Sequence, residues 1–151
     1  IFPALSGPNW KTTITANFAS NIIRNYWSYM VIFCGHFPDG AEKFTVDEFE
    51  NEDQARWYLR QMLGSANISG SRLVHIMSGN LSHQIEHHLF PDVPANRYAE
   101  LAPEIRDICA RYGQHYSTGS LPRQFASVIW RICRHAFPSS PRESAEGLVL
   151  E

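Results

Sequence analysis

The sequence predicts an all-α protein, and two features carry that prediction. Residues 98–112 place large apolar side chains three and four positions apart, which is the spacing of one helical face. Residues 12–34 form a long, mostly apolar run in which polar side chains recur at helical spacing. No segment alternates apolar and polar residues well enough to predict a strand, and the chain contains no internal repeat and no second domain.

The first predicted element is a helix over residues 12–34. Its polar stripe consists of Asn17, Asn21, Arg24, Asn25 and Ser28. The run is long enough to cross a bilayer, but an arginine and three asparagines are costly against lipid. The stripe therefore fits a soluble amphipathic helix, or a membrane helix that turns this face toward protein or a wet cavity. A helix continued to His36 would carry that histidine on the polar face, before Pro38 ends it.

The acidic segment 37–53 is predicted to be a surface loop that leads into a short helix. Asp53 is a suitable N-cap for a helix over 54–63, and Gly64 is a suitable stop. The turn-rich residues 65–71 are predicted to be a connector.

Three further helices are predicted toward the C-terminus. Residues 72–90 read as helical with a weak point at Ser78-Gly79, and residues 94–112 as a helix that Pro103 could divide. Residues 121–137 form a last helix with an apolar side and a basic character, and 138–151 are predicted to be a disordered tail.

Composition excludes some classes of protein. A net charge of -2 argues against a nucleic-acid binder. Three widely spaced cysteines form neither a disulfide framework nor a zinc-knuckle pattern, which fits a reducing compartment. The chain begins at Ile1 without a signal-peptide layout, so we expect it to be a piece of a longer protein.

The stretch GNLSHQIEHHLFPD, residues 79–92, concentrates the chemistry of the chain. On a helix, His83 lies four residues before His87, and Gln84 lies four residues before His88, so each pair would share a face. His87 and His88 would point about 100° apart around the axis. This arrangement favours two metal ions side by side, and imidazole alone is compatible with Zn, Cu, Fe or Ni.

The other histidines carry weaker predictions. His115 and His135 are expected to be ordinary solvated side chains, and His75 is a weaker metal candidate than His36. Glu86 is expected to orient an imidazole or to form a salt bridge rather than to bind metal itself.

GNLSHQIEHHLFPDVPANRY resembles the third histidine box of the membrane fatty acid desaturases, in the variant in which glutamine opens the box. NYWSYMVIFCGHFPDG is similar to the last membrane helix, and its exit, of bacterial acyl-CoA or acyl-lipid desaturases. The resemblance covers roughly residues 12–137.

The resemblance implies a C-terminal part, residues 1–137, of an integral-membrane helical desaturase. It implies one membrane helix over about 12–34, a cytosolic box region over 72–112 and a membrane-surface helix over 121–137. The box would lie on the cytoplasmic side. Such enzymes hold two iron ions and use O₂ and an electron donor, such as ferredoxin, a flavin reductase or cytochrome b5, to desaturate an acyl-CoA or acyl lipid.

Carried over residue by residue, the resemblance makes His87 and His88 iron ligands. His36 matches a histidine near the end of the last membrane helix, and His83 is a further candidate beside Gln84, which stands where many relatives have histidine. The HxxxH and HxxHH boxes of the family are not in this chain, so we expect it to be inactive alone. The alternatives are a related di-iron hydroxylase or alkane monooxygenase, and a non-catalytic soluble helical metal-binding module.

Overall fold

The structure is a computed structural model that describes residues 1–45 and 52–137. The predicted tail at 138–151 and part of the predicted acidic loop, residues 46–51, lie outside the described residues.

The described residues are mostly helical, which confirms the predicted fold class at that level. The elements are α1 (Phe2–Leu5), η1 (Gly7–Asn9), α2 (Trp10–His36), α4 (Gln54–Leu63), β1 (Asn67–Ser69), α5 (Arg72–Met77), α6 (Gln84–Leu89), η2 (Ala95–Arg97), α7 (Tyr98–Arg111), β2 (Thr118–Ser120) and α8 (Leu121–His135).

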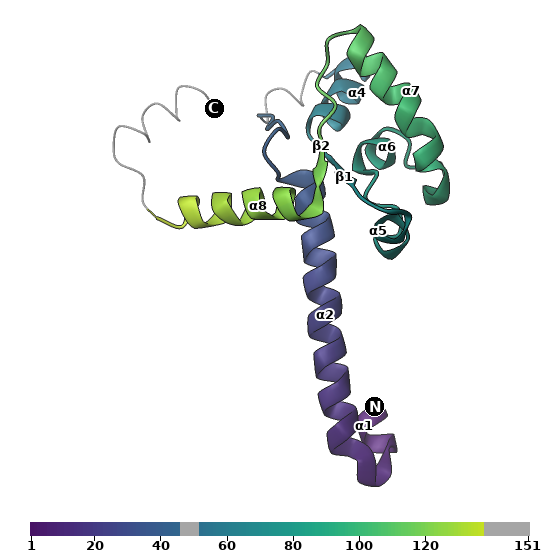
Figure 1. Ribbon diagram of the computed structural model, residues 1–151, viewed down its shortest axis with the longest axis vertical. Helices are drawn as coiled ribbons and strands as arrows, with labels where there is room; N and C mark the ends of the chain where they lie inside the picture. The colour runs from purple at the N-terminus through teal and green to yellow at the C-terminus, as the bar shows by residue number, and fades with distance from the viewer. Residues whose placement is uncertain (46–51, 138–151) are drawn as a thin grey trace.

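The long helix α2 stands apart from the rest of the molecule over most of its length (Figure 1). Helices α4 to α7 gather at its C-terminal end, and α8 begins beside that end and extends away from α2 to the other side (Figure 1). The buried residues of α2 are Val31, Cys34 and Gly35, all in its last turns. The chain therefore consists of a compact head, α4 to α7 with the two strands, mounted on one end of a protruding helix.

The helix over 54–63 is confirmed with its cap. The Asp53 carboxylate accepts the Arg56 N–H at 2.7 Å, which satisfies one of the free donors of the first turn, and the helix ends at Gly64.

The connector 65–71 was wrongly predicted to lack regular structure. Its residues Asn67–Ser69 form β1, which pairs in parallel with β2, with Asn67 opposite Thr118 and Ser69 opposite Ser120. Three-residue strands are too short to display an alternating pattern, so sequence periodicity could not reveal them. The pair joins the middle of the chain to the start of α8.

The single helix predicted over 72–90 is also wrong. It is two short helices, α5 and α6, separated by a turn in which Gly79 and Asn80 both have positive φ, +63° and +62°. Two consecutive left-handed residues cannot belong to an α-helix. The predicted weak point is therefore a complete break, and α6 begins only at Gln84.

The helix predicted over 94–112 is a 3₁₀ turn, η2, followed by α7. Pro103 lies inside α7 without dividing it. The buried face is Tyr98, Ala102, Ile105 and Cys109, whereas Ile108 and Tyr112 of the predicted apolar stripe are exposed. The buried face of α7 is therefore rotated slightly around the helix axis from the apolar stripe that the sequence predicted.

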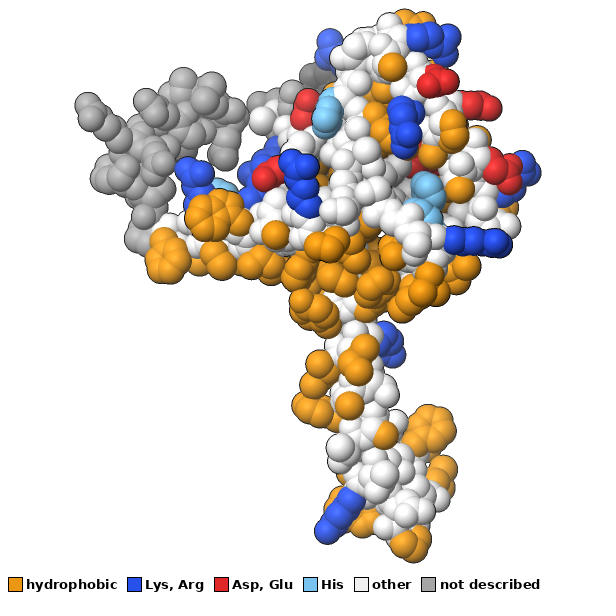
Figure 2. All heavy atoms as spheres, in the orientation of Figure 1, with side chains coloured by type: hydrophobic (Ala, Val, Ile, Leu, Met, Phe, Trp, Pro, Cys, Tyr) orange, Lys and Arg blue, Asp and Glu red, His pale blue; other side chains and the backbone are white. Residues whose placement is uncertain are grey.

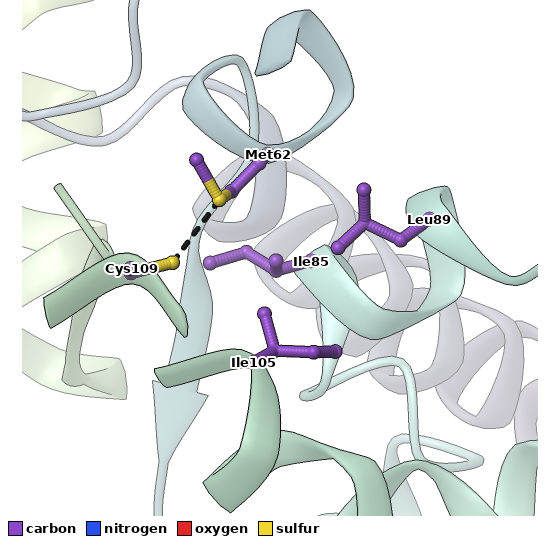
Figure 3. Packing of buried hydrophobic residues seen from close by; sticks show 5 residues of the cluster. All are labelled: Met62, Ile85, Leu89, Ile105 and Cys109. Atoms are coloured by element: carbon purple, nitrogen blue, oxygen red, sulfur yellow. Dashed lines mark hydrogen bonds between the residues drawn. The ribbon is translucent and has the colours of Figure 1, made fainter. Parts of the chain in front are cut away.

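One hydrophobic core holds α6 in place between α4 and α7. It consists of Met62, Ile85, Leu89, Ile105 and Cys109 (Figure 3). The Cys109 thiol lies 3.1 Å from the Met62 sulfur (Figure 3). A second core of Val31, Cys34 and Ile68 joins α2 to β1. The two cores fix α6 relative to the end of α2.

Over residues 1–45 and 52–137, no helix combines the length and the apolarity of a membrane span. Much of α2 nevertheless exposes apolar side chains, including Phe18, Ile22, Ile23 and Tyr26.

Candidate metal centre

Helix α6 has the sequence QIEHHL, and its N-terminus is capped by a residue that is distant in the chain. Its own N-cap residue, His83, makes no capping hydrogen bond, whereas the Asn67 Oδ1 atom in β1 accepts the buried Ile85 N–H at 2.8 Å. Six residues are too few to form a stable helix without tertiary contacts. Ile85 and Glu86 are fully buried, so the core and this cap determine which way the helix faces.

The side of α6 that carries Gln84 and His88 meets the last residue of α2. The Nε2 atoms of His36 and His88 lie 3.2 Å apart, and the Gln84 amide nitrogen lies 3.5 Å from His36 Nε2. The prediction that Gln84 and His88 share a helical face is confirmed, because both reach His36. The structure therefore brings together three of the predicted site residues from two elements.

The remaining ring nitrogens of this pair point away from each other. His36 Nδ1 lies 2.8 Å from the Ile32 carbonyl oxygen, and His88 Nδ1 lies 3.0 Å from Gln61 Oε1. Both oxygens can only accept, so each Nδ1 must carry the hydrogen. In neutral rings the two facing Nε2 atoms then hold lone pairs, which repel one another unless a cation lies between or beside them.

Protonation of His88 would remove the repulsion between the two lone pairs, but it is unfavourable. Burial, with the neighbouring His36 and His87 as further causes, lowers the pKa of His88 to about 4. At neutral pH its ring is therefore uncharged and its Nε2 atom is available as a ligand.

The spacing of the pair fits a metal ion. Two imidazole nitrogens bound in neighbouring positions, each at about 2.0–2.1 Å, lie roughly 3.0–3.4 Å apart. The observed 3.2 Å lies within that range. The N–H groups directed to Ile32 and Gln61 are the outer hydrogen bonds that metal-binding histidines usually make.

The pair also faces open space. His36, Gln61 and His88 line a cavity of about 460 Å³ together with the basic side chains of Lys43, Arg60 and Arg131. Further ligands or a substrate can approach the pair through this cavity.

His87 lies on the neighbouring side of α6, as predicted. Its ring is held from α7, where the Tyr98 hydroxyl lies 3.1 Å from Nδ1. Tyr98 is almost fully buried, and burial together with Asp92 raises the pKa of its phenol, so the hydroxyl stays protonated at neutral pH. His87 therefore has a fixed ring and an Nε2 atom with no hydrogen bond to any residue that the structure describes.

His83 has a different environment from the one predicted. It precedes α6 rather than sharing a helical face with His87, because the Gly79-Asn80 turn delays the start of the helix. Its ring stacks on His75, with centroids 4.8 Å apart, and its Nδ1 atom lies 3.8 Å from the Glu86 carboxylate. Burial lowers its pKa. Its Nε2 atom is buried with no hydrogen-bond partner among the described residues.

Glu86 was expected to orient an imidazole or to form a salt bridge, but its hydrogen bonds are to other groups, and its contact with an imidazole, His83 Nδ1, is 3.8 Å long. The carboxylate is fully buried and accepts hydrogen bonds from Asn67 Nδ2 and the Tyr116 hydroxyl, both at 2.7 Å. Burial and the nearby Glu86 raise the pKa of Tyr116, so its phenol remains a donor. Glu86 thus anchors α6 from the side opposite to His88.

Sequence reasoning missed Gln61, Asn67, Tyr98 and Tyr116. These residues lie 11 to 30 positions from the box residues that they contact. No local spacing connects them to the histidines, so only the folded chain identifies them.

In the parts of the chain that the structure describes, no three histidine, cysteine, aspartate or glutamate side chains converge to hold a metal ion by themselves. What the described residues form is a pair of facing imidazoles with an amide beside them and His87 adjacent. These residues, from the end of α2 and from α6, form a candidate for one side of a histidine-based metal site.

Comparison with known proteins identifies the family. A family model described as fatty acid desaturase matches residues 2–120, and the chain belongs to this family. It is 53% identical over 134 residues to the NADPH-dependent stearoyl-CoA 9-desaturase of Mycobacterium tuberculosis. The aligned region is 86% of this chain and 31% of the relative. It is 30% identical over 98 residues to human fatty acid desaturase 3, covering 65% of this chain and 20% of that protein.

The chain therefore spans about a third or less of the length of these curated relatives. No solved structure matches it.

Proposed function

We propose that this chain forms one side of the di-iron centre of an O₂-dependent acyl-CoA desaturase and is the C-terminal part of that enzyme. The observation that carries the proposal is the pair of facing Nε2 atoms of His36 and His88, whose Nδ1 atoms both donate elsewhere. The family membership and the short coverage of the relatives support it. Activity then belongs to the whole enzyme, and the chain alone is inactive.

In this proposal His36, His87 and His88 hold iron, and His83 and Gln84 are further donors. The buried Nε2 atom of His83, which lacks a partner among the described residues, supports its inclusion. When bound, iron supplies with O₂ and two electrons the oxidant that removes two hydrogens from a saturated acyl chain. Burial lowers the pKa of His88, contacts with Ile32, Gln61 and Tyr98 fix the ring orientations, and Glu86 anchors α6.

The substrate is an acyl-CoA rather than an acyl lipid. The name of the mycobacterial relative, a stearoyl-CoA 9-desaturase, supports this class. Because that relative is NADPH-dependent, the electrons for this enzyme come from NADPH through a donor protein of the flavin reductase, ferredoxin or cytochrome b5 type.

The enzyme is anchored in a membrane with its metal centre on the cytoplasmic side. Figure 2 supports this orientation, because apolar side chains form a band beneath α8 and across the junction with α2, whereas most charged side chains lie on the head above it. Exposed apolar side chains on these elements include Leu73, Ile76 and Met77 of α5, and Ile129, Trp130 and Ile132 of α8. In this arrangement α2 enters the membrane with its polar stripe against other parts of the protein, and α5 and α8 lie at the membrane surface.

The decisive experiment expresses the full-length protein in membranes and analyses the acyl products by mass spectrometry. We expect iron, O₂-dependent turnover and an alkene from stearoyl-CoA, and no turnover of the same chain esterified in phospholipid. A hydroxylated chain without alkene would assign the protein to the related hydroxylases or alkane monooxygenases. If the chain is monodisperse without detergent and binds stoichiometric zinc but no iron, it is a non-catalytic metal-binding module.

A further inference from the structure

The two facing histidines are fixed by acceptors of different kinds. His36 Nδ1 donates to a main-chain carbonyl, that of Ile32, whereas His88 Nδ1 donates to a side-chain amide, that of Gln61. A helical carbonyl cannot turn around. A glutamine amide can rotate by 180° and present its NH₂ group in place of its oxygen.

The orientation of the Gln61 amide determines the tautomer of His88. With Oε1 toward the ring, Nδ1 carries the hydrogen and Nε2 carries the lone pair. With NH₂ toward the ring, the lone pair must be on Nδ1 and the hydrogen on Nε2. Because His36 Nε2 is an acceptor 3.2 Å away, the second tautomer would form a direct hydrogen bond between the two histidines. That bond would block both nitrogens as ligands.

Gln61 is well placed for this selection. It belongs to α4, which is packed on α6 through Met62 in the core, so the backbone positions of Gln61 and His88 are coupled. The Ser65 hydroxyl donates to the Gln61 main-chain carbonyl at 2.6 Å and reinforces the last turn of α4. The Gln61 side chain also lines the cavity at the pair.

We propose that Gln61 is a positioning residue that holds His88 in the tautomer able to bind metal. The proposal rests on the proposed function, because it takes His36 and His88 as ligands. Gln61 does not bind the metal. It acts through the ring of His88 and keeps the pair open to a divalent metal ion such as Fe²⁺.

The test compares Gln61→Leu, Gln61→Glu and Gln54→Leu in the full-length protein reconstituted in nanodiscs. Leucine removes the acceptor, glutamate keeps an acceptor and cannot donate when ionised, and Gln54 is an exposed residue on the same helix. Metal affinity is measured at pH 8 by titration with Fe²⁺ under anaerobic conditions, and with Co²⁺ followed by its visible absorption. Circular dichroism confirms folding.

We expect Gln61→Leu to weaken metal binding by roughly 10–100-fold, the usual effect of removing an outer partner. Gln61→Glu should bind at least as tightly as the native protein, and Gln54→Leu should be unchanged. A merely structural role for Gln61 would not produce this rescue by glutamate.

Two results would overturn the assignment of Gln61 alone. One is native affinity in Gln61→Leu, and the other is an equal loss in Gln61→Leu and Gln61→Glu while the native protein binds metal. A native protein that binds no iron or cobalt would overturn the proposed function and this assignment with it.

Discussion

His36 and His88 are 52 positions apart in the chain, yet their Nε2 atoms lie 3.2 Å from each other. One residue ends the protruding helix α2, and the other belongs to a six-residue helix in the head. Because each ring donates its Nδ1 hydrogen outward, the contact is not an ordinary hydrogen bond between neutral histidines. In the proposed function metal binds at this pair, and the relationship leads to five predictions.

The first prediction concerns the two facing rings. In the full-length protein, His36→Ala and His88→Ala should each lower iron affinity by at least the roughly 10–100-fold that loss of an outer partner costs. His115→Ala, which removes an exposed imidazole, is the matched control and should retain native iron content. Iron content by mass spectrometry of purified protein is the measurement. Full iron occupancy in both pair variants would contradict the site.

The second prediction concerns Gln84, which the structure places beside Gly35. A Cβ atom at Gly35 would lie 3.0 Å from the Gln84 side chain, so Gly35→Ala should displace the amide from His36. If Gln84 is a ligand, Gly35→Ala and Gln84→Leu should both weaken metal binding. Gln84→His should bind metal at least as tightly as the native protein. Unchanged Co²⁺ affinity in Gln84→Leu would remove Gln84 from the ligand set.

The third prediction concerns Asn67, which caps α6 and donates to the buried Glu86 carboxylate. Asn67→Ala leaves a buried N–H without its acceptor and a buried carboxylate with one donor fewer, at about 1–3 kcal/mol each. We expect the free energy of unfolding to fall by about 2–6 kcal/mol in denaturant titrations. The exposed Asn96→Ala should change it by less than about 0.5 kcal/mol. Equal effects of the two substitutions would contradict the capping role.

The fourth prediction concerns pH. The pKa of His88 is lowered to about 4 in the folded chain from an ordinary value of 6.5, so the unfolded state binds more protons between these values. Proton uptake by the unfolded state therefore favours unfolding at low pH. The free energy of unfolding of the metal-free protein should fall as the pH falls from about 6.5 toward 4. Thermal unfolding at a series of pH values measures this effect, and His88→Gln should flatten the profile. An unaltered profile in that variant would assign the acid sensitivity to other groups.

The fifth prediction concerns the apolar band. A spin label at Ile76→Cys on α5, in a Cys133→Ser background, should be more accessible to O₂ than to a water-soluble nickel complex in nanodiscs. Ile108→Cys on α7 has similar exposure, 46% against 61%, and should show the reverse preference because α7 lies farther than α5 from the protruding part of α2 (Figure 1). Power-saturation electron paramagnetic resonance makes the comparison. Water accessibility at both positions would exclude α5 from the membrane surface.

Sequence predicted the parts of this structure that depend on neighbouring residues. The helix over 54–63 was correct because Asp53 and Gly64 act on the turns beside them. The histidine box was recognised because its residues are contiguous. The break at Gly79-Asn80 was underestimated, because a positive φ at Asn80 depends on the contacts of the turn as well as on residue type.

The supporting groups of the site could not be predicted in the same way. Gln61 and Tyr98 come from helices that sequence analysis identified, yet nothing in their spacing assigns either to a particular histidine. Their roles arise when α4 and α7 pack on α6 around Ile85. The paired strands were missed for a related reason, because each consists of only three residues and depends on the other.

Helix α2 also limits how the sequence can vary. The Trp27 indole donates to the Met77 carbonyl at 3.0 Å, and His36 follows nine residues later on the same continuous helix. Each residue of an α-helix advances about 1.5 Å and turns about 100°. One residue inserted between these two contacts would turn His36 away from His88. An insertion of about seven residues, two full helical turns, would restore the direction of His36 but move it by roughly 10 Å. The segment between Trp27 and His36 can therefore change its side chains during evolution, but its length is fixed.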